Sequence, residues 1–435
     1  MFSKILIANR GEIAVRIIRA CKEMGIATVA VYSEADRDAL HTALADESFC
    51  IGGNLATDSY LNEDRIISTA LASGAQAIHP GYGFLSENAH FAGLCRKHGL
   101  VFIGPTPENM EKLSDKTGIK ALMQEAGLRV IPGTDALNSL KEAQEKAEEI
   151  GYPVMLKARS GGGGRGIRLV ETPDKLESEF SLAVAEGEAA FGDGAVYLEK
   201  YIYPARHVEV QILSDEMGHV VCLGERDCSI QRRHQKLIEE SPSPEVCDFK
   251  RQELMFLCSE AVKSVGYVGV GTLEFLLDQS GRFWFMEMNV RLQVEHGVTE
   301  MLTNCDLVKW QIRTSAGVPL NFSQEEIRMD GSVLECRINA RSTGRVNMLH
   351  IPGGPFVRFD TWLVQGTIVS PFYDSLLGKL IVYAGTREQA VRKMRAALCE
   401  LVIDGVETNV REQLDIISDS RFMSGQYDLT FMEGR

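Results

Sequence analysis

The sequence predicts an α/β protein of two or three domains, the first of which is built on a parallel, doubly wound sheet. Its 435 residues can bury a large core. Apolar strand-like runs alternate with amphipathic helix-like runs to about residue 110, and repeated strand–helix units of this kind favour a parallel sheet. A compact α/β module around a run of glycines follows, and a β-rich segment precedes the last helix.

The N-terminal pattern is regular enough to predict individual elements. Strands are expected at 5–8 and 28–32, and helices at 12–24 and 61–72. Gly11 stands alone after the first strand, so the GxGxxG fingerprint of a dinucleotide site is absent. A helix is then expected over 114–127, and Pro132-Gly133 indicates a boundary.

The rest of the chain divides into a small module and a longer β-rich part. The module, at 134–203, has the size of a mobile lid; its expected elements are a helix at 139–150, strands at 153–158 and 167–170, a helix at 174–187 and a strand at 195–200. Beyond it, strands are expected at 206–213, 219–224, 270–277 and 282–288, and helices at 249–265, 299–315 and 386–401.

Composition and charge argue against several classes of function. The formal net charge is −14, from 46 basic and 60 acidic side chains, which argues against a broad nucleic-acid or anionic-membrane surface. No apolar run has membrane length, and the first residues lack the pattern of a secretory signal. The ten cysteines form no CxxC pair and no zinc-ligand spacing, so reduced, mostly buried thiols are expected. We expect a cytoplasmic protein without nucleic-acid or membrane partners.

The glycine run is the first motif that indicates chemistry. Lys157 ends one strand-like stretch, glycines fill 161–164 and position 166, and a second strand-like stretch follows. Glycines let backbone N–H groups close on phosphate oxygens, and a lysine on a strand adds a fixed positive charge. The GK[ST] of a Walker A loop is absent. Phosphate binding is favoured over a purely structural hairpin.

A pair of acidic strands is the second motif. If the two strands form a hairpin, Glu274 and Glu287 face the same side and Asn289 lies two residues further along. Carboxylates among Phe, Met and Leu are costly to bury unless a cation pairs with them, and magnesium held by two carboxylates and nucleotide phosphates fits. The alternative is a pair of edge carboxylates in solvent.

The segment after these strands is the third motif. Period-two alternation puts Arg291, Gln293 and Glu295 on one face of an extended segment and turns His296 the other way, toward a structural role. An arginine fork can hold bicarbonate while a neighbouring carboxylate takes its proton. A plain ion pair between Arg291 and Glu295 is the alternative.

At these and other motifs the chain resembles the biotin carboxylase family of ATP-grasp enzymes over nearly its whole length. The motifs that carry the resemblance are ANRGEIAVRIIRA (8–20), HPGYGFLSEN (79–88), KARSGGGGRG (157–166), EKYI (199–202), RHVEVQ (206–211), ERDCSIQRRHQK (225–236), FMEMNVRLQVEH (285–296), ECRINA (335–340) and YDSLLGKL (373–380). The resemblance implies an N-terminal Rossmann-like domain at 1–113, an ATP-grasp domain at 114–330 that includes the lid, and a β-rich C-terminal biotin carboxylase domain at 331–435.

The resemblance also implies the roles of individual residues. The implied ATP contacts are Lys116, Lys157, Gly163, Gly164, Glu199, Lys200, Ile202, His207, Gln231, His234, Glu274 and Glu287. The implied ligands of Mg²⁺ or Mn²⁺ are Glu274, Glu287 and Asn289, and the implied bicarbonate site is Lys236, Arg291, Gln293, Val294 and Glu295. Glu295 would be the general base, Arg337 would stabilise the biotin enolate, Lys236 and Arg291 would complete the catalytic set, and Glu87 would lie nearby.

The implied activity is that of an ATP-dependent ligase. ATP, bicarbonate and carrier-bound biotin would give ADP, phosphate and N1′-carboxybiotin through carboxyphosphate. No AMKM-type biotinylation site is present, so a separate biotin carboxyl carrier protein and carboxyltransferase subunits are the expected partners. Acetyl-CoA is the expected acceptor, as in the first half-reaction of acetyl-CoA carboxylase in fatty acid synthesis, with another acyl-CoA or a 2-oxo acid such as pyruvate as alternatives. A homodimer is expected because Arg19, Glu23 and Arg358 match interface positions.

The chain departs from the family pattern in four places. Arg159 and Ser160 stand where the lid has a small residue and a glycine, and Gly297 replaces a proline. The loop at 341–350 is several residues short, which puts biotin or carrier docking in doubt, and the chain ends early enough to trim a peripheral helix.

Two other functions stay open on the sequence. An ATP-grasp ligase that couples an acyl phosphate to an amine would not need the RLQVEH segment. A nucleotide-binding subunit without turnover would not need Glu274, Glu287, Arg291, Glu295 and Arg337.

Overall fold

A parallel five-stranded sheet forms the N-terminal part of the computed structural model, which describes residues 1–114, 118–159 and 166–434. Its strands lie in the order β3-β2-β1-β4-β5 and have the bounds β1 Lys4–Ile7, β2 Ala27–Ser33, β3 Glu47–Gly52, β4 Ala77–His79 and β5 Val101–Phe102. The helices are α1 Gly11–Glu23, α2 Leu40–Leu44, α3 Glu63–Ser73, α4 Ala89–Lys97 and α5 Pro107–Ser114. The predicted doubly wound sheet is confirmed.

The alternating directions of the side chains on β1 explain why helices cover both faces of this sheet. Ile5 and Ile7 pack with α1 and with α11 (Leu307–Ser315), whereas Leu6 packs with α3 and α4 on the opposite face. Successive side chains of a strand point to opposite faces, so a strand that is apolar at every position needs a helical layer on each side.

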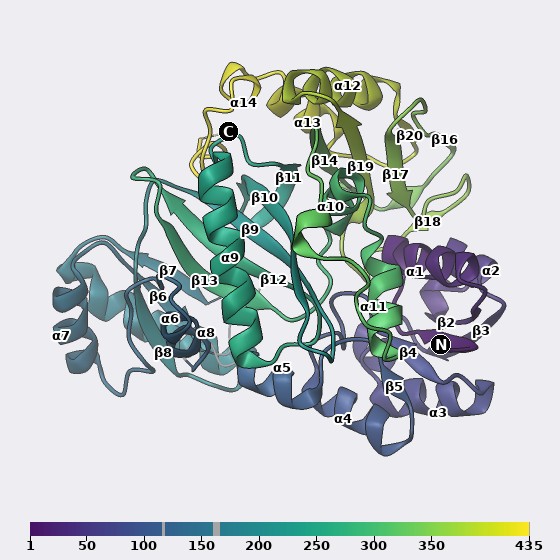
Figure 1. Ribbon diagram of the computed structural model, residues 1–435, viewed down its shortest axis with the longest axis horizontal. Helices are drawn as coiled ribbons and strands as arrows, with labels where there is room; N and C mark the ends of the chain where they lie inside the picture. Colours follow the sequence, from purple (N-terminus) through teal and green to yellow (C-terminus); the bar gives the residue numbers. More distant parts are fainter. Residues whose placement is uncertain (115–117, 160–165, 435) are drawn as a thin grey trace.

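The module expected at 134–203 forms the left-hand end of the molecule in Figure 1, across from the N-terminal sheet. It contains α7 Leu140–Ile150, β6 Val154–Ala158, β7 Ile167–Val170, α8 Leu176–Phe191 and β8 Val196–Lys200. Its three strands are antiparallel in the order β7-β6-β8, and Lys157 pairs with Ile167 across the predicted hairpin. Helix α6, Gly118–Glu125, precedes it and lies within the range 114–127 where a helix was expected.

An antiparallel sheet of eight strands forms the centre of the molecule. The order is β13-β12-β9-β10-β11-β14-β19-β17, with the bounds β9 Ala205–Ser214, β10 Val220–Arg232, β11 Gln235–Ser241, β12 Gly269–Asp278, β13 Phe283–Asn289, β14 Ser332–Asn339, β17 Val357–Thr361 and β19 Leu376–Ala384. The sheet continues across residue 330, where we place a domain boundary, and the division into three domains remains our proposal.

The other elements cover this sheet or extend from its C-terminal half. They are α9 Asp248–Val265, α10 His296–Thr303, α11, α12 Arg387–Glu400, α13 Val410–Ile417, α14 Ser420–Met423 and the short strands β15 Gly344–Arg345, β16 Met348–His350, β18 Ile368–Val369 and β20 Val402–Asp404. The shortened loop therefore contains β15 and β16, which pair with β18 and β20.

Two sequence expectations were wrong in this region. The helix expected over 299–315 is two helices, because Asn304 takes a left-handed φ of 56° and Asp306 caps the start of α11 by accepting from the Lys309 N–H. The strand expected over 219–224 runs on to Arg232, and the returning strand β11 was not predicted.

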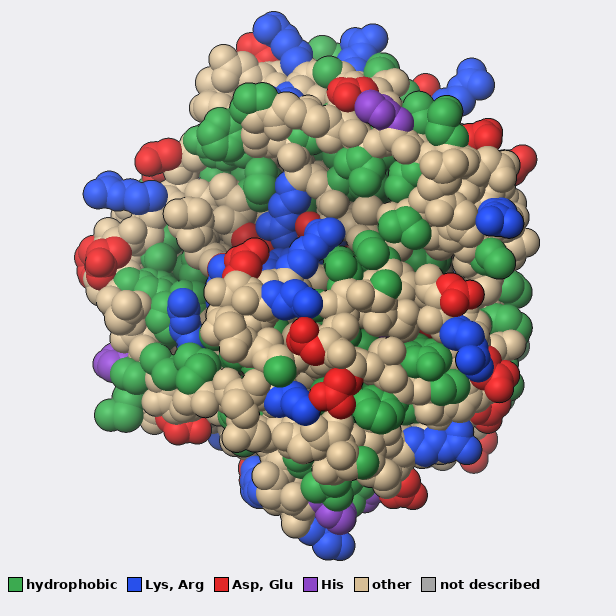
Figure 2. Space-filling view, turned by 90° about the vertical axis from the view of Figure 1, so that its right-hand side faces the viewer, with side chains coloured by type: hydrophobic (Ala, Val, Ile, Leu, Met, Phe, Trp, Pro, Cys, Tyr) green, Lys and Arg blue, Asp and Glu red, His purple; other side chains and the backbone are tan. Residues whose placement is uncertain are grey.

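Most of the cysteines are buried, as expected, and one face of the surface carries charges of both signs. Figure 2 shows a face on which acidic and basic side chains are interspersed. Seven of the ten cysteines are buried and none is in a disulfide. Among the described residues, no helix is long and apolar enough to cross a membrane.

Candidate functional site

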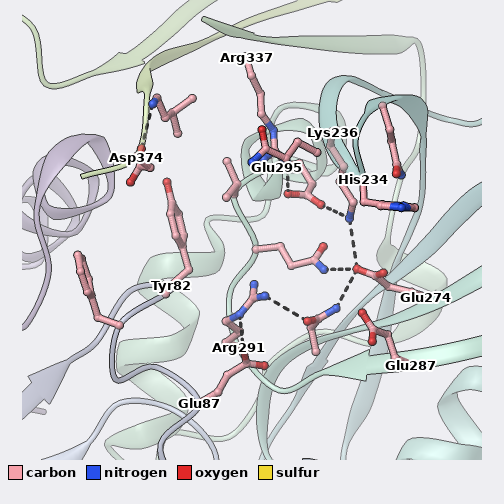
Figure 3. Close-up of a pocket in the computed structure, with 18 of the residues that line it drawn as sticks. Tyr82, Glu87, His234, Lys236, Glu274, Glu287, Arg291, Glu295, Arg337 and Asp374 are labelled. Carbon is pink, nitrogen blue, oxygen red and sulfur yellow. Dashed lines mark hydrogen bonds and ion pairs between the residues drawn. The ribbon is translucent and has the colours of Figure 1, made fainter. Parts of the chain in front are cut away.

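A cavity of about 1150 Å³ lies where the N-terminal part, the central sheet and the C-terminal part meet. It is lined from the N-terminal part by Tyr82 and Glu87, from the β10–β11 hairpin by His234 and Lys236, from the β12–β13 hairpin by Glu274 and Glu287, and from later segments by Arg291, Glu295 and Arg337 (Figure 3). The cavity thus collects charged side chains that lie far apart in the sequence.

Lys236 is the cation at the centre of the cluster. Its Nζ lies 2.6 Å from Glu209 Oε2, 2.7 Å from Glu295 Oε1 and 3.2 Å from Glu274 Oε1. Burial alone would lower the pKa of Lys236, but the three carboxylates raise it well above its usual range. The lysine therefore stays charged, and it holds three strands and a loop together.

Glu295 is held between two cations. Besides Lys236, it accepts a hydrogen bond of 2.9 Å from Arg337 Nη2, and only 2% of its side chain is exposed. Burial would raise the pKa of this carboxyl group, but Lys236, Arg337 and Arg226 lower it well below its usual range. Glu295 is therefore an anion at neutral pH, which a proton acceptor must be.

Arg337 links Glu295 to a second buried carboxylate. Its Nε donates to Glu239 Oε1 at 2.6 Å. Burial and Glu295 raise the pKa of Glu239 and Arg337 lowers it, with a net rise to about 7. Because both carboxylates lie on the same side of Arg337, the guanidinium is fixed in orientation at the wall of the cavity.

The Arg291 to Glu295 segment is a loop that ends in a turn, not the extended segment that we expected. Arg291 Nε lies 3.0 Å from Glu87 Oε2, and Arg291 Nη2 donates to Asn289 Oδ1 at 3.2 Å. Glu295 pairs with other cations, so the simple Arg291–Glu295 ion pair is not what holds the loop. Arg291, Gln293 and Glu295 still line one cavity, and His296 is fully buried.

Gln293 is oriented by a buried arginine that sequence reasoning missed. Arg226 Nη2 donates to Gln293 Oε1 at 3.1 Å, and Gln293 Nε2 donates to Glu274 Oε1 at 2.6 Å. Arg226 is fully buried and also pairs with Glu209 at 2.6 Å. An amide whose oxygen is occupied by Arg226 presents its N–H₂ group to the cavity. The ERD motif contains Arg226, but nothing in its spacing marks it as a partner of Gln293.

The acidic pair lies as the hairpin pattern predicts. Glu274 on β12 pairs directly with Glu287 on β13, and Asn289 lies opposite Thr272. In Figure 3 the two carboxylates lie near each other at the edge of the cavity. Burial would raise the pKa of Glu274, but Lys236 and His207 lower it.

Magnesium fits Glu274 and Glu287 with nucleotide phosphates as further ligands, because it prefers oxygen and is commonly bound by one or two carboxylates plus phosphates. Asn289 fits less well in this arrangement, since its Nδ2 donates to Glu274 Oε1 at 2.8 Å and its Oδ1 accepts from Arg291. The close groups of potential ligands among the described residues are His207 with Glu209 and Glu274, and Glu209 with Cys228 and Glu295. Their nearness to Lys236 and Arg226 favours ion pairs over a metal there.

Several of the predicted nucleotide residues form a second cluster that reaches the cavity wall through Lys157, whereas Glu199, Lys200 and Ile202 are not among the residues that line the cavity. Glu199 Oε2 lies 2.5 Å from Lys157 Nζ, and Glu199 also pairs with Lys120 on α6. Lys120 was missed because one lysine in an amphipathic helix carries no motif. The Lys200 N–H donates to Pro132 O at 2.7 Å, Lys200 Nζ donates to Gly151 O at 2.7 Å, and Ile202 lies in the segment that follows β8. Lys116, Gly163 and Gly164 lie outside the described residues.

The other predicted nucleotide residues come from β9 and the β10–β11 hairpin. His207 Nδ1 lies 2.8 Å from Gln231 Nε2, and His207 Nε2 lies 3.0 Å from Glu274 Oε2. His234 is in the two-residue turn with Arg233, and their φ angles are 63° and 50°. Burial and Lys157 lower the pKa of His234. All these side chains line the cavity except Arg233, and their roles remain predictions.

Gly297 stands where the family pattern has a proline, and close packing at this position favours a residue without a side chain. A Cβ at this position would lie 2.4 Å from Ile381 Cδ1, and Ile381 is fully buried. A side chain at 297 would therefore require Ile381 to move.

Known proteins resemble the chain along its whole length. Family models match in order: "Biotin carboxylase, N-terminal domain" over 1–110, "Carbamoyl-phosphate synthase L chain, ATP binding domain" over 115–323 and "Biotin carboxylase C-terminal domain" over 335–434. The biotin carboxylase of Haemophilus influenzae is 49% identical over 442 residues, which cover 100% of this chain and 98% of that protein.

Solved structures agree with this likeness. The biotin carboxylase domain dimer of Hydrogenobacter thermophilus 2-oxoglutarate carboxylase, in complex with MgADP, ADP and bicarbonate, superposes with a TM-score of 0.97 at 48% identity, over 100% of this chain and 97% of that one. The biotin carboxylase subunit of a pyruvate carboxylase has a TM-score of 0.85 at 48% identity, over 100% and 98%.

Glu335 is a buried carboxyl group near the site, and its ionisation can be tested through the pH dependence of the protein's stability. It lies opposite Glu239 in the β11–β14 ladder, and neither of its carboxyl oxygens has a hydrogen-bond partner among the described residues. Burial and Glu239 raise the pKa of Glu335 well above its usual range, although Lys379 and Arg337 lower it. A raised pKa contributes stability that is full below the unfolded-state pKa and is lost as the pH rises through the folded-state pKa.

We expect Glu335→Gln, which cannot ionise, to stabilise the protein more at pH 8 than at pH 5, by about 1–3 °C in melting temperature. Thermal melts of wild type and variant at both pH values measure this difference. Glu216→Gln, at an exposed carboxylate, is the control and should show no such difference. An equal shift for Glu335→Gln at both pH values would mean that Glu335 is ionised in the folded protein.

Proposed function

Because the chain belongs to the biotin carboxylase family, we propose that it catalyses the ATP-dependent carboxylation of biotin on a separate carrier protein, with bicarbonate as the carboxyl source. The observation that carries this proposal is the placement of Glu295 between Lys236 and Arg337, in a cavity that Arg291 and Gln293 also line. A proton acceptor, an anion site and a group suited to an enolate thus lie side by side.

The first step is the activation of bicarbonate. Bicarbonate is a poor carboxyl donor, so one of its oxygens attacks the γ-phosphorus of ATP, ADP leaves, and carboxyphosphate forms. Arg291 and Gln293 hold the anion, Glu295 takes its proton, and Lys236 neutralises charge on the transferring phosphoryl group. Magnesium held by Glu274 and Glu287 would supply further charge neutralisation at the phosphates.

The second step is the transfer to biotin. Carboxyphosphate decomposes to CO₂ and phosphate, phosphate accepts the N1′ proton of biotin, and the resulting enolate attacks CO₂. Arg337 provides the positive charge for the enolate oxygen. Closure of the 134–203 module over the nucleotide would keep water from carboxyphosphate.

The charge balance of the site supports the role of Glu295 as a base. Lys236 and Arg337 lower the pKa of Glu295, which by itself makes Glu295 a weak base. Bicarbonate and the γ-phosphate would bring negative charge next to it, and a nearby like charge raises the pKa of a carboxyl group. Glu295 therefore becomes a better proton acceptor when its substrates are bound.

Acetyl-CoA carboxylase is the system in which we place this activity, with acetyl-CoA as the final acceptor and carboxyltransferase subunits as further partners. The support is the match to stand-alone biotin carboxylases over 98% of their length. A 2-oxo acid carboxylase is the second candidate, since the matching domain of a 2-oxoglutarate carboxylase is 48% identical. A cytoplasmic location is part of the same proposal.

We also propose a homodimer, as the Hydrogenobacter thermophilus domain is described as one. Arg19 is exposed, while Glu23 lies 2.5 Å from Lys309 and Arg358 is bound to Glu300 at 2.8 Å. The interface positions are therefore a mixture of exposed and internally paired groups, and Phe356 beside them is 62% exposed.

Turnover with free biotin tests the function directly. We expect the purified protein to release ADP from MgATP only when bicarbonate is present, and faster when biotin is added. An ATP-grasp ligase for an amine would not respond to biotin, and a subunit without turnover would bind ATP and release no ADP. The copurified biotinylated carrier and carboxyltransferase subunits, offered acetyl-CoA, pyruvate or 2-oxoglutarate, would identify the acceptor.

Substitution of Glu295 and of Arg337 should separate the two steps. Glu295→Ala should reduce bicarbonate-dependent ADP release by about 10²–10⁴-fold, because bicarbonate keeps its proton, and carboxybiotin should fall with it. Arg337→Ala should keep ADP release and lose carboxybiotin, because Lys236 still holds Glu295 while the charge for the enolate is gone. Arg392→Ala, at a residue exposed on α12, is the control. Equal loss of both activities in folded Arg337→Ala would contradict this division of roles.

A further inference from the structure

In the turn around Val294, the backbone carbonyl groups accept hydrogen bonds from the surrounding protein. The Val294 carbonyl accepts a hydrogen bond of 2.7 Å from Lys379 Nζ, and the Gln293 carbonyl lies 2.8 Å from His296 Nδ1. The Glu295 carbonyl accepts from the Val298 N–H at 3.1 Å. Three successive carbonyl groups are therefore engaged away from the cavity.

The opposite ends of these peptide groups are available to a ligand. In a planar trans peptide the C=O and the N–H point in opposite directions, so the bond from Lys379 to the Val294 carbonyl turns the Glu295 N–H away from Lys379. The bond from His296 to the Gln293 carbonyl does the same for the Val294 N–H. Within the described part of the chain neither N–H donates a hydrogen bond, and Val294 and Glu295 both line the cavity. Successive free N–H groups of this kind form an anion site.

Lys379, which makes the bond to the Val294 carbonyl, is a buried cation. It lies on β19 with 0% of its surface exposed, and an ammonium group is costly to bury. Its second partner is Glu12 at the start of α1, 3.1 Å away. Burial lowers the pKa of Lys379, but Glu12, Glu335 and Asp360 raise it, so the ammonium stays charged. A charged donor makes a stronger bond to a carbonyl than a neutral one.

We propose that Lys379 is a positioning residue for bicarbonate: by fixing the Val294 carbonyl, it aims the Val294–Glu295 backbone N–H groups at the anion held by Arg291 and Gln293. The inference rests on the proposed function, since that function identifies the anion. Lys379 acts through the peptide group, and it connects the C-terminal strand β19 and the N-terminal helix α1 to the loop that carries the base.

The test compares Lys379→Met in two backgrounds. In wild type the substitution leaves Glu12 buried without its cation, whereas in Glu12→Gln it leaves a neutral partner. The loss of the Val294 bond is common to both backgrounds, and the unpaired Glu12 carboxylate is not. We expect the KM for bicarbonate in bicarbonate-dependent ADP release to rise about tenfold or more in each background, and the KM for ATP to stay within about twofold. Thermal melts show whether each variant is folded.

The outcomes are distinct from those of the function test. If wild type releases no ADP in response to bicarbonate and biotin, the proposed function fails. If wild type turns over and both folded Lys379→Met variants keep the wild-type KM for bicarbonate, the positioning role is wrong. A parallel rise of the KM for ATP, or loss of the folded protein in both backgrounds, would also overturn it, because Lys379 would then serve the fold in general.

Discussion

The structure depends on one constraint: several buried charges must neutralise one another without solvent. Lys236 lies within hydrogen-bond distance of three carboxylates, and Glu295 connects it to Arg337. Removing one partner of such a cluster leaves an uncompensated buried charge, which typically costs about 3–5 kcal/mol. The side chains to which we assign catalytic roles therefore also fix the relative positions of β11, β12, β14 and the loop after β13.

This arrangement also explains why the cavity is suited to anionic substrates. The cations at its wall are engaged by carboxylates, and Lys236, Arg291 and Arg337 are each held by at least two partners. Incoming phosphate or bicarbonate would compete with these carboxylates for the same donors. Glu199 holds Lys157 and Lys120 in the same way, and in our proposal ATP would compete with it for these lysines. The site is thus preorganised before substrate arrives, and little reorganisation is needed in the transition state.

Sequence patterns predicted the parts of this site that lie close together in the chain. The Glu274 and Glu287 pair follows from strand alternation, and the β6–β7 hairpin follows from two strand-like stretches around glycines. The β10–β11 hairpin was missed because its turn is Arg233-His234, both at positive φ, where Asn-Gly is the usual signal. Arg226, Lys120 and Lys379 were missed because their roles depend on partners 67, 79 and 85 positions away. A buried cation shows no periodicity of its own, so only the fold reveals what it holds.

The central claim is that this charge cluster brings a bicarbonate oxygen to the γ-phosphorus of ATP. Oxygen-isotope transfer tests it most directly: bicarbonate labelled with ¹⁸O is supplied with unlabelled MgATP and biotin, and the released phosphate is analysed by mass spectrometry. The account predicts one labelled oxygen in each phosphate, because the C–O bond of carboxyphosphate breaks after its P–O bond has formed. Phosphate with oxygen from water only would show that ATP is hydrolysed without attack by bicarbonate, and would contradict the account.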